Sequence, residues 1–116
     1  MKDTADFDVN AFEKASLDKI GMIPQIIVRY RSSYFNHIFS GDYCAGYYSY
    51  TWAAVLDADA FKAFKETGDI FNPKVATSFR KNILEKGDTD DPMKLYIKFR
   101  GTTPNPDALL KKRGLK

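Results

Sequence analysis

Apolar residues recur every three or four positions through most of this chain, which is the spacing of amphipathic helices. The longest such pattern runs from about Tyr43 to Glu66. Its first half is apolar on almost every side, whereas its second half keeps one apolar stripe through Phe61 and Phe64. A helix without a polar side is normally buried on several faces. The pattern therefore predicts one long central helix that a larger body covers.

Shorter helices are expected on both sides of the central one. The patterns place them at about residues 8–20 and 73–86, from residue 92 onward, and, as a short last helix, from residue 106 or 107. Asn72 and Asp91 each precede a proline, which is a common way to begin a helix. Gly21, Gly68 and Gly87 are the expected stops.

The segments between these helices carry weaker signals. Residues 26–28 are β-branched and are compatible with an extended strand or with packing against a neighbour, and residues 29–42 are expected to be irregular. Arg29 and Arg31 are either anchors for carboxylates or, as the alternative, a pair that binds a peptide carboxylate. The expected fold class is all-α, an irregular helical fragment in one domain spanning residues 1–116.

Composition narrows the class of protein. A hydrophobic content of 44% and a charged content of 28% are typical of a globular chain and argue against disorder. A single cysteine excludes an internal disulfide. The net charge of +3 is small, and the basic residues at the C-terminus lack interleaved aromatics, so no nucleic-acid partner is expected. No run is long enough to span a bilayer and the first residues are polar, so we expect no membrane partner and a cytoplasmic location.

Candidate chemistry is concentrated between residues 34 and 50. This stretch joins the only histidine, His37, to a turn with Gly41 and Gly46 and then to several tyrosines. If the segment is helical, Tyr43, Tyr47 and Tyr50 fall at i, i+4 and i+7 on one face. A phenol is neutral at pH 7 and can donate a hydrogen bond to an oxyanion, and His37 adds a second kind of donor. Such donors beside a glycine turn suit recognition of a peptide carbonyl.

A structural interpretation stands beside this one. An aromatic stripe at helical spacing is more often packed in a core than placed in an active site, and a lone histidine is more often a hydrogen-bonded structural residue. The two glycines favour the functional interpretation, because a purely structural helix has little use for glycine before and inside its first turn.

The same stretch carries a resemblance to a known family. Residues 37–50 and 52–61 resemble the C-terminal part of the thimet oligopeptidase and peptidyl-dipeptidase family of zinc metallopeptidases, and most of all the bacterial peptidyl-dipeptidase branch. Further matches follow in order at residues 21–27, 29–35, 72–76, 79–80, 83–84, 99–101, 104–110 and 113–115. The pattern departs from the family at Asp42, where glycine is common, and at Ala54, where glutamate is frequent.

The resemblance implies roles for the candidate residues. It makes Tyr50 the first candidate for a catalytic donor to the oxyanion, with His37 and Tyr43 binding the substrate backbone or assisting. Tyr47 is a further substrate-binding candidate, together with the glycine turn at Gly41 and Gly46. The turn at residues 40–42 would close on the peptide.

The metal of the family has no counterpart in this sequence. The family holds zinc with a His-Glu-x-x-His helix and a later glutamate, and this chain has neither. A catalytic zinc normally takes three protein ligands, and one His and one Cys with Asp57 and Asp59 do not make a convincing set. Zinc is therefore expected in the complete family enzyme, with none bound by this chain alone.

We therefore expect the substrate-binding part of a zinc peptidase, which acts on short peptides and is inactive without its missing metal-binding body. The alternatives are a peptide-binding module that does not hydrolyse, and a non-catalytic partner that docks on a peptidase. Because an uncovered aromatic helix promotes association, a homo-oligomer is also expected.

Overall fold

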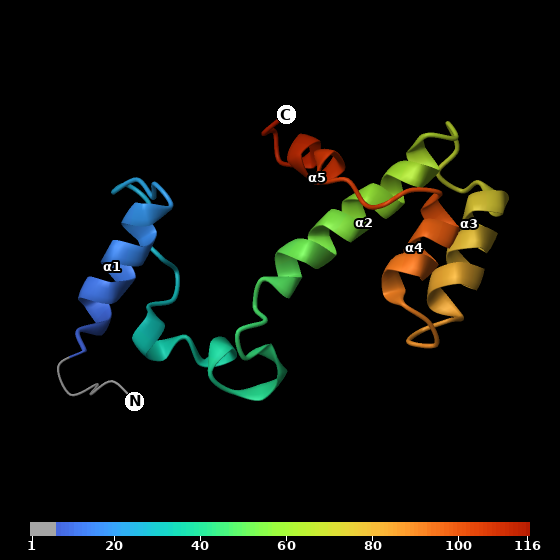
Figure 1. Ribbon diagram of the computed structural model, residues 1–116. Helices are drawn as coiled ribbons and strands as arrows, with labels where there is room; N and C mark the ends of the chain where they lie inside the picture. Colours follow the sequence, from blue (N-terminus) through green and yellow to red (C-terminus); the bar gives the residue numbers. More distant parts are fainter. Residues whose placement is uncertain (1–6) are drawn as a thin grey trace. The chain divides into compact units, whose positions relative to one another are not determined.

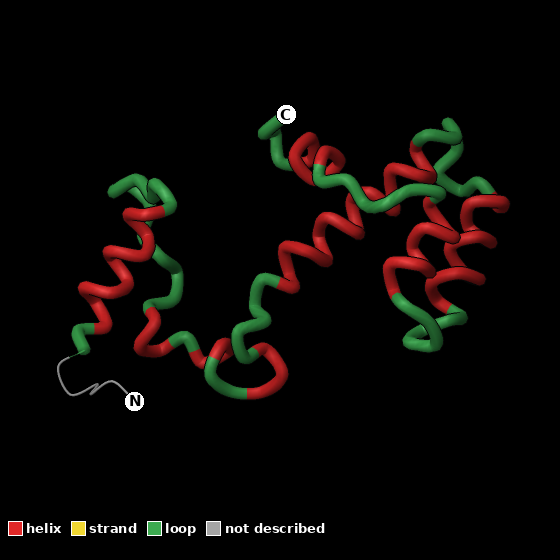
Figure 2. Tube along the Cα trace, in the orientation of Figure 1, coloured by secondary structure: helices red, strands yellow, loops and turns green. Residues whose placement is uncertain are grey.

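The computed structural model of the protein describes residues 7–116, and every regular element in that range is helical (Figure 2). The all-α class predicted from the sequence is confirmed. The chain divides into two compact units, Met1–Tyr47 and Tyr48–Lys116. The expectation of a single domain over residues 1–116 stays a prediction.

The first unit contains one regular helix, α1 (Val9–Lys19), followed by irregular chain (Figure 1). The carboxylate of Asp8 caps this helix by accepting hydrogen bonds from the backbone amides of Asn10 and Ala11, at 2.9 and 3.1 Å. Gly21 follows in the left-handed conformation, with a φ of 73°. The helix therefore ends before Gly21 as predicted, because glycine has no Cβ to oppose positive φ.

Three short 3₁₀ turns make up the rest of this unit: η1 (Ser32–Tyr34), η2 (Asn36–Ile38) and η3 (Gly41–Tyr43). Glu13 of α1 holds the first of them. Its carboxylate accepts a hydrogen bond from the Ser32 amide at 2.8 Å and lies 2.7 Å from Nε of Arg31. The Ser32 amide is the main cause that lowers the pKa of Glu13 below its usual value. Arg31 is therefore a structural anchor, as one of the two sequence interpretations predicted.

The second unit is built on α2 (Ser49–Lys65), with α5 (Asp107–Lys112) packed beside it (Figure 1). Val55 and Ala58 of α2 meet Leu109 of α5 in a small apolar core. Two further helices, α3 (Pro73–Phe79) and α4 (Pro92–Arg100), lie together at the C-terminal end of α2. A short π-helical turn, η4 (Arg80–Leu84), continues α3.

Aromatic rings connect α2 to the α3–α4 pair. Phe79 of α3 contacts Phe64 of α2 and Phe99 of α4 edge to face, with ring centroids 6.2 and 5.1 Å apart. Tyr96 of α4 continues this chain of rings at 6.1 Å from Phe99. Offset and edge-to-face contacts of this kind add to the stabilisation that burial alone supplies. Of these rings, the sequence pattern had placed Phe64 in the apolar stripe of the central helix.

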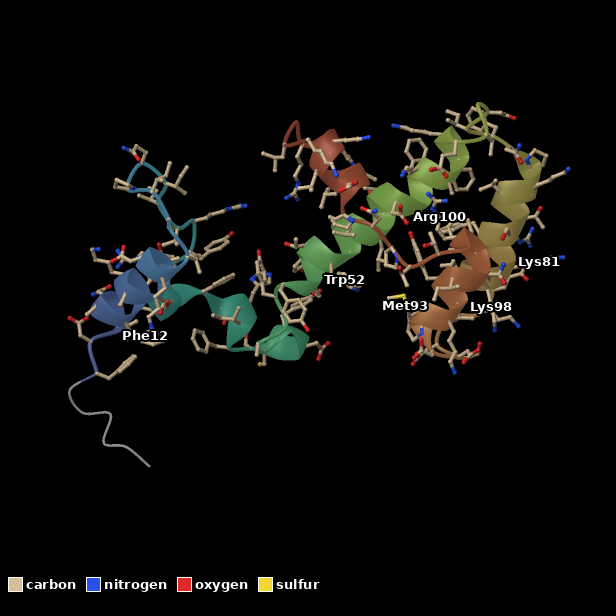
Figure 3. The ribbon with its side chains drawn as sticks, turned by 45° about the horizontal axis from the view of Figure 1, so that its top comes forward. Phe12, Trp52, Lys81, Met93, Lys98 and Arg100 are labelled. Atoms are coloured by element: carbon tan, nitrogen blue, oxygen red, sulfur yellow. The ribbon has the colours of Figure 1, made fainter. Side chains whose placement is uncertain are left out.

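A buried polar network joins the same helices. Asp59 of α2 is only 1% exposed and accepts a hydrogen bond from the Tyr96 hydroxyl at 2.7 Å. Nε of Arg100 lies 3.5 Å from the same carboxylate oxygen, and its Nη1 lies 2.9 Å from Glu66 (Figure 3). Burial, followed by the hydrogen bond to Asp59, raises the pKa of Tyr96 far above its usual value, so this phenol stays protonated.

The central helix begins later than predicted. α2 starts at Ser49, whereas the sequence pattern placed the start near Tyr43. Ala45 takes a left-handed backbone conformation with a φ of 54°, which interrupts any helix that passes through it. Tyr43 and Tyr47 therefore precede the helix that carries Tyr50, and the expected single helical face of three tyrosines is not formed.

Large apolar side chains remain exposed on both units. Ile27 of the first unit is 86% exposed, and Tyr48 and Phe71 of the second are 74% and 83% exposed. Trp52 on α2 is half exposed (Figure 3). No helix among the described residues has the length and apolar character that crossing a membrane requires.

Candidate functional site

The first unit brings three of the six predicted site residues together with Phe35 in one aromatic cluster, which we call the His37 cluster: Phe35, His37, Tyr43 and Tyr47. The ring of His37 lies 6.1 Å from Tyr43 and 5.9 Å from Tyr47, between centroids. Phe35 contacts Tyr47 edge to face at 4.7 Å and lies 6.5 Å from His37. Outside the cluster, Tyr30 stacks on Phe35 at 5.1 Å.

Short turns, rather than a long helix, position these rings. His37 sits in η2 and Tyr43 in η3, and Ser40 connects the two turns. The Ser40 amide donates to the Asn36 carbonyl at 2.9 Å, while its hydroxyl donates to the Asn36 side-chain oxygen at the same distance. Serine and asparagine often stabilise turns in this way, because their side chains reach the nearby backbone. The link keeps the chain tightly folded between His37 and Tyr43.

The two predicted turn glycines differ in what their positions demand. Gly41 has a φ of 76°, which glycine adopts without strain. Gly46 does not have positive φ, and a Cβ built there would meet its nearest neighbours at 3.8 Å, an ordinary contact. Ala45, next to it, is the residue with positive φ. Conformational freedom is therefore required at Gly41 but not at Gly46.

The cluster is partly open to solvent. Tyr43 is 38% exposed and His37 is exposed, while Phe35 and Tyr47 are half-buried. Phe35 and Tyr47 thus form a packed base, and His37 and Tyr43 lie at its accessible side. An imidazole and two phenols in this arrangement offer polar hydrogens or acceptors on an apolar support, which is a common composition of ligand sites.

Tyr50 belongs to the second unit, where it is the second residue of α2. Its side chain is half exposed, and Tyr48 and Trp52 beside it in sequence are also exposed. All three lie at the start of the helix, ahead of the apolar core around Val55. This end of α2 is therefore an exposed aromatic surface.

The described residues do not form a zinc site. Within residues 7–116, no group of three or more His, Cys, Asp or Glu side chains is placed to hold a metal ion. Asp59, one of the carboxylates considered from the sequence, is occupied by Tyr96 and Arg100. Asp57 lies on the exposed side of α2 beside Lys112. The residues in this described range therefore do not fit a catalytic zinc by themselves.

Sequence reasoning missed two sets of residues. Phe35 lies in the stretch between residues 34 and 50, but the sequence predicted no role for it. Turns of 3₁₀ type have no long period from which side-chain contacts can be read. The contact of Asp59 with Tyr96 and Arg100 was also missed. The available signal was spacing: Tyr96 and Arg100 lie one helical turn apart, and Asp59 lies between two alanines in a mainly apolar part of α2.

Comparison with known proteins places the chain in a family. Residues 2–115 match the model of Peptidase family M3. Oligopeptidase A of Haemophilus influenzae is 53% identical over 81 residues, which are 70% of this chain and 12% of that protein. Dipeptidyl carboxypeptidase of Escherichia coli is 40% identical over 115 residues, 99% of this chain and 16% of that protein. A probable cytosolic oligopeptidase A of Arabidopsis thaliana is 50% identical over 84 residues, 70% of this chain and 12% of that protein.

The chain thus spans only between 12% and 16% of the length of these relatives. The match extends over nearly the whole chain and includes both units. The family match over residues 2–115 and the all-helical fold agree with the resemblance that the sequence pattern suggested. The chain belongs to Peptidase family M3 and corresponds to a part of its longer members.

Proposed function

We propose that this chain is the substrate-binding part of an M3 peptidase and contributes hydrogen-bond donors to the scissile peptide. The observation that carries the proposal is the His37 cluster, in which three of the predicted site residues come together on short turns. Family membership supports peptides as the substrates. The members of the family use zinc, and that ion would be held by residues outside this chain.

The proposed roles follow the chemistry of peptide hydrolysis. When water adds to the scissile carbonyl, the carbonyl oxygen gains negative charge, and a donor aimed at that oxygen lowers the barrier. We assign this donor role to Tyr50, because the hydroxyl of a tyrosine can donate a hydrogen bond to an oxyanion. His37 and Tyr43 bind the substrate backbone, with Tyr47 beside them, and Gly41 allows the turn between them. Gly46 is proposed to lie beside the substrate, although its own backbone conformation does not require glycine.

The complete reaction requires a second part. Because the described residues do not hold a metal, we expect no hydrolysis by this chain alone and place its activity in a complex with the metal-binding body. The location proposed for that complex is the cytoplasm, in line with the cytosolic relative.

Complementation tests the proposal. The chain is mixed with a body made from Escherichia coli dipeptidyl carboxypeptidase lacking its matching segment, and hydrolysis of an N-blocked neutral peptide is followed with zinc added. We expect no turnover by either part alone and measurable turnover by the mixture. The Tyr50→Phe variant should lose about a hundredfold in kcat, the usual effect of removing one oxyanion donor.

Tyr48→Phe is the matched control, because Tyr48 is a more exposed tyrosine two residues away with no assigned role. Its rate should stay within twofold of the unmodified chain. Equal losses for Tyr48→Phe and Tyr50→Phe would reject the assignment. Peptide binding that needs Tyr43, without turnover in any mixture, would favour the non-catalytic binding module instead.

A further inference from the structure

A groove with a basic rim runs between α2 and α5 in the second unit. It has a volume of about 570 Å³. Ala58 and Phe61 of α2 and Ala108 of α5 form its apolar floor, and Phe61 is 47% exposed there. Its rim consists of one carboxylate and four ammonium groups: Asp57, Lys62, Lys65, Lys111 and Lys112. The two helices lie side by side in Figure 1, so both contribute to one surface.

The charge on this rim is only partly compensated. Lys112 lies 3.5 Å from Asp57 and Lys62 lies 3.5 Å from Glu66, and all four side chains are more than 40% exposed. Glu66 is already held more closely by Arg100, at 2.9 Å. Among residues 7–116, no carboxylate lies within 4.0 Å of the ammonium of Lys65 or Lys111. The groove therefore presents a net positive rim over an apolar floor.

Lys65 also lies close enough to the apolar floor of the groove to contact a ligand bound there. Its ammonium lies 5.0 Å from the centre of the Phe61 ring, within the range of a cation–π contact. This contact holds the charge near the apolar surface without neutralising it. A ligand that covers Phe61 would thus meet a positive charge at its edge.

We propose that this groove binds short acidic peptides, with an apolar side chain on Phe61 and Ala58 and carboxylates on Lys65 and Lys111. The inference rests on the proposed function in one respect, since a peptidase supplies the reason for a peptide ligand. Its chemistry is independent of the His37 cluster and of Tyr50. It names a class of substrate, peptides in which acidic residues flank an apolar one.

The composition of the rim favours a free peptide over permanent cover by the rest of the peptidase. Lysine is depleted at the buried centres of stable interfaces, because its ammonium is strongly hydrated and costly to desolvate. Exposed lysines instead attract an oppositely charged ligand and contribute modestly to each contact. An apolar floor with a hydrated basic rim is therefore suited to a ligand that comes and goes.

Fluorescence anisotropy with a labelled acetyl-Glu-Glu-Leu-Glu-Glu peptide tests the proposal on the 1–116 chain. We expect saturable binding that weakens as salt is raised, because the contacts are between exposed charges. The double variant Lys65→Glu/Lys111→Glu should bind at least about tenfold more weakly, since two attractions become repulsions. The milder pair Lys65→Gln/Lys111→Gln should weaken binding about three- to fivefold, and circular dichroism confirms that each variant is folded.

The matched control is Lys74→Glu/Lys81→Glu, which changes the net charge equally. Lys74 lies on α3 and Lys81, labelled in Figure 3, lies on η4, and neither residue lines the groove. Its affinity should stay within twofold of the unmodified chain. Absence of saturable binding, or equal weakening by the groove and control pairs, would overturn the proposal. Phe61→Ser should weaken binding of this peptide. The same variant should leave the binding of an all-glutamate peptide unaffected, because that peptide has no apolar side chain to place on Phe61.

Two further binding measurements distinguish this proposal from the oxyanion role of Tyr50 and from a contact with the metal-binding body. The Tyr50→Phe variant should bind the acidic peptide as well as the unmodified chain, so the groove and the oxyanion role can fail independently. Adding the metal-binding body should leave the affinity unchanged. If the body abolishes binding while the chain alone binds, the groove is a contact with that body and the substrate inference is wrong.

Discussion

At the residue scale, the loop that carries Tyr43 separates two glycines that look alike in the sequence. Gly41 has a φ of 76°, where an added Cβ is strained, while Gly46 has an ordinary backbone and room for a Cβ. Gly41→Ala should therefore destabilise this loop by about 1 kcal/mol, and Gly46→Ala should not. Amide hydrogen exchange across residues 36–47 measures the difference. Faster exchange in both variants, or in neither, would contradict it.

The buried carboxylate of Asp59 gives a second prediction at this scale. Asp59 is 1% exposed and is held by Tyr96 and Arg100, so Asp59→Ala leaves a guanidinium without its buried partner. We expect a loss of about 3 kcal/mol in the free energy of unfolding of the second unit. Urea unfolding monitored by Trp52, the single tryptophan, measures it.

Asp57→Ala is its control on the same helix. The Asp57 side chain is 70% exposed, and its contact with Lys112 is 3.5 Å long. Exposed ion pairs of this kind contribute at most about 1 kcal/mol to the free energy of unfolding. A loss at Asp57 as large as that at Asp59 would show that helix α2 is sensitive to any change of charge, and that burial is not the cause.

The arrangement of the candidate residues differs from the one that the sequence predicted. His37, Tyr43 and Tyr47 do come together, yet through two 3₁₀ turns and the Ser40 link instead of one helical face. Spacing on a helix could be read from the sequence because its period is regular. The positive φ of Ala45 could not, since alanine carries no turn signal and only the surrounding structure imposes that conformation.

At the scale of elements, the two helix starts marked by Asn72-Pro73 and Asp91-Pro92 were the most predictable features. The side chain of Asn72 accepts hydrogen bonds from the amides of Lys74 and Val75, at 3.0 and 3.3 Å, as the Asn-Pro pair predicted. Asn72→Ala should cost the second unit about 1 kcal/mol, and Asn72→Asp should retain most of the cap. Urea unfolding distinguishes the two variants, and equal stabilities would argue against a role for the cap.

The end of α2 should respond to acid through Glu66. Hydrogen bonds from Arg100 are the main cause that lowers the pKa of this carboxyl below its usual 4.5. A group whose pKa is lower in the folded state stabilises the fold above its unfolded pKa, and this contribution disappears as the pH falls through the folded value. Stability of the second unit should therefore fall as the pH is lowered below 4.5.

Glu66→Gln is the matched variant for this titration. It keeps the size of the side chain and a hydrogen-bond acceptor but removes the charge that Arg100 attracts. Its unfolding free energy should change less between neutral and acidic pH than that of the unmodified chain. An identical pH profile in both proteins would assign the acid sensitivity to other carboxylates.

At the scale of the whole molecule, the exposed apolar residues predict self-association of the isolated chain. Tyr48, Tyr50 and Trp52 at the start of α2 are each at least 49% exposed, and exposed apolar surface of this kind drives association. Sedimentation equilibrium should give a mass that rises with protein concentration. Trp52→Glu should shift the equilibrium toward monomer, whereas Lys81→Glu should not. A concentration-independent monomer mass would contradict the prediction.

The organisation into two units was not predictable in the same way as the helices. Caps and apolar periods are local, so a single sequence reveals them. The division after Tyr47 depends on which side chains meet across many residues, such as Phe79 with Phe64 and Phe99. Burial in the described residues is sparse, and the chain spans only 12% to 16% of the length of these relatives.

The Asp59 network has a consequence for how α4 and α2 are aligned. Asp59 and Glu66 are two turns apart on α2, and Tyr96 and Arg100 are one turn apart on α4, so the four groups match in only one register. A shift of about 5.4 Å, one helical turn, would place the buried carboxylate against hydrocarbon. Aromatic rings alone tolerate such a slip more readily. We therefore expect that the main role of the network is to fix the register of α4 along α2. Replacing its four residues by apolar ones should preserve stability but allow more than one register.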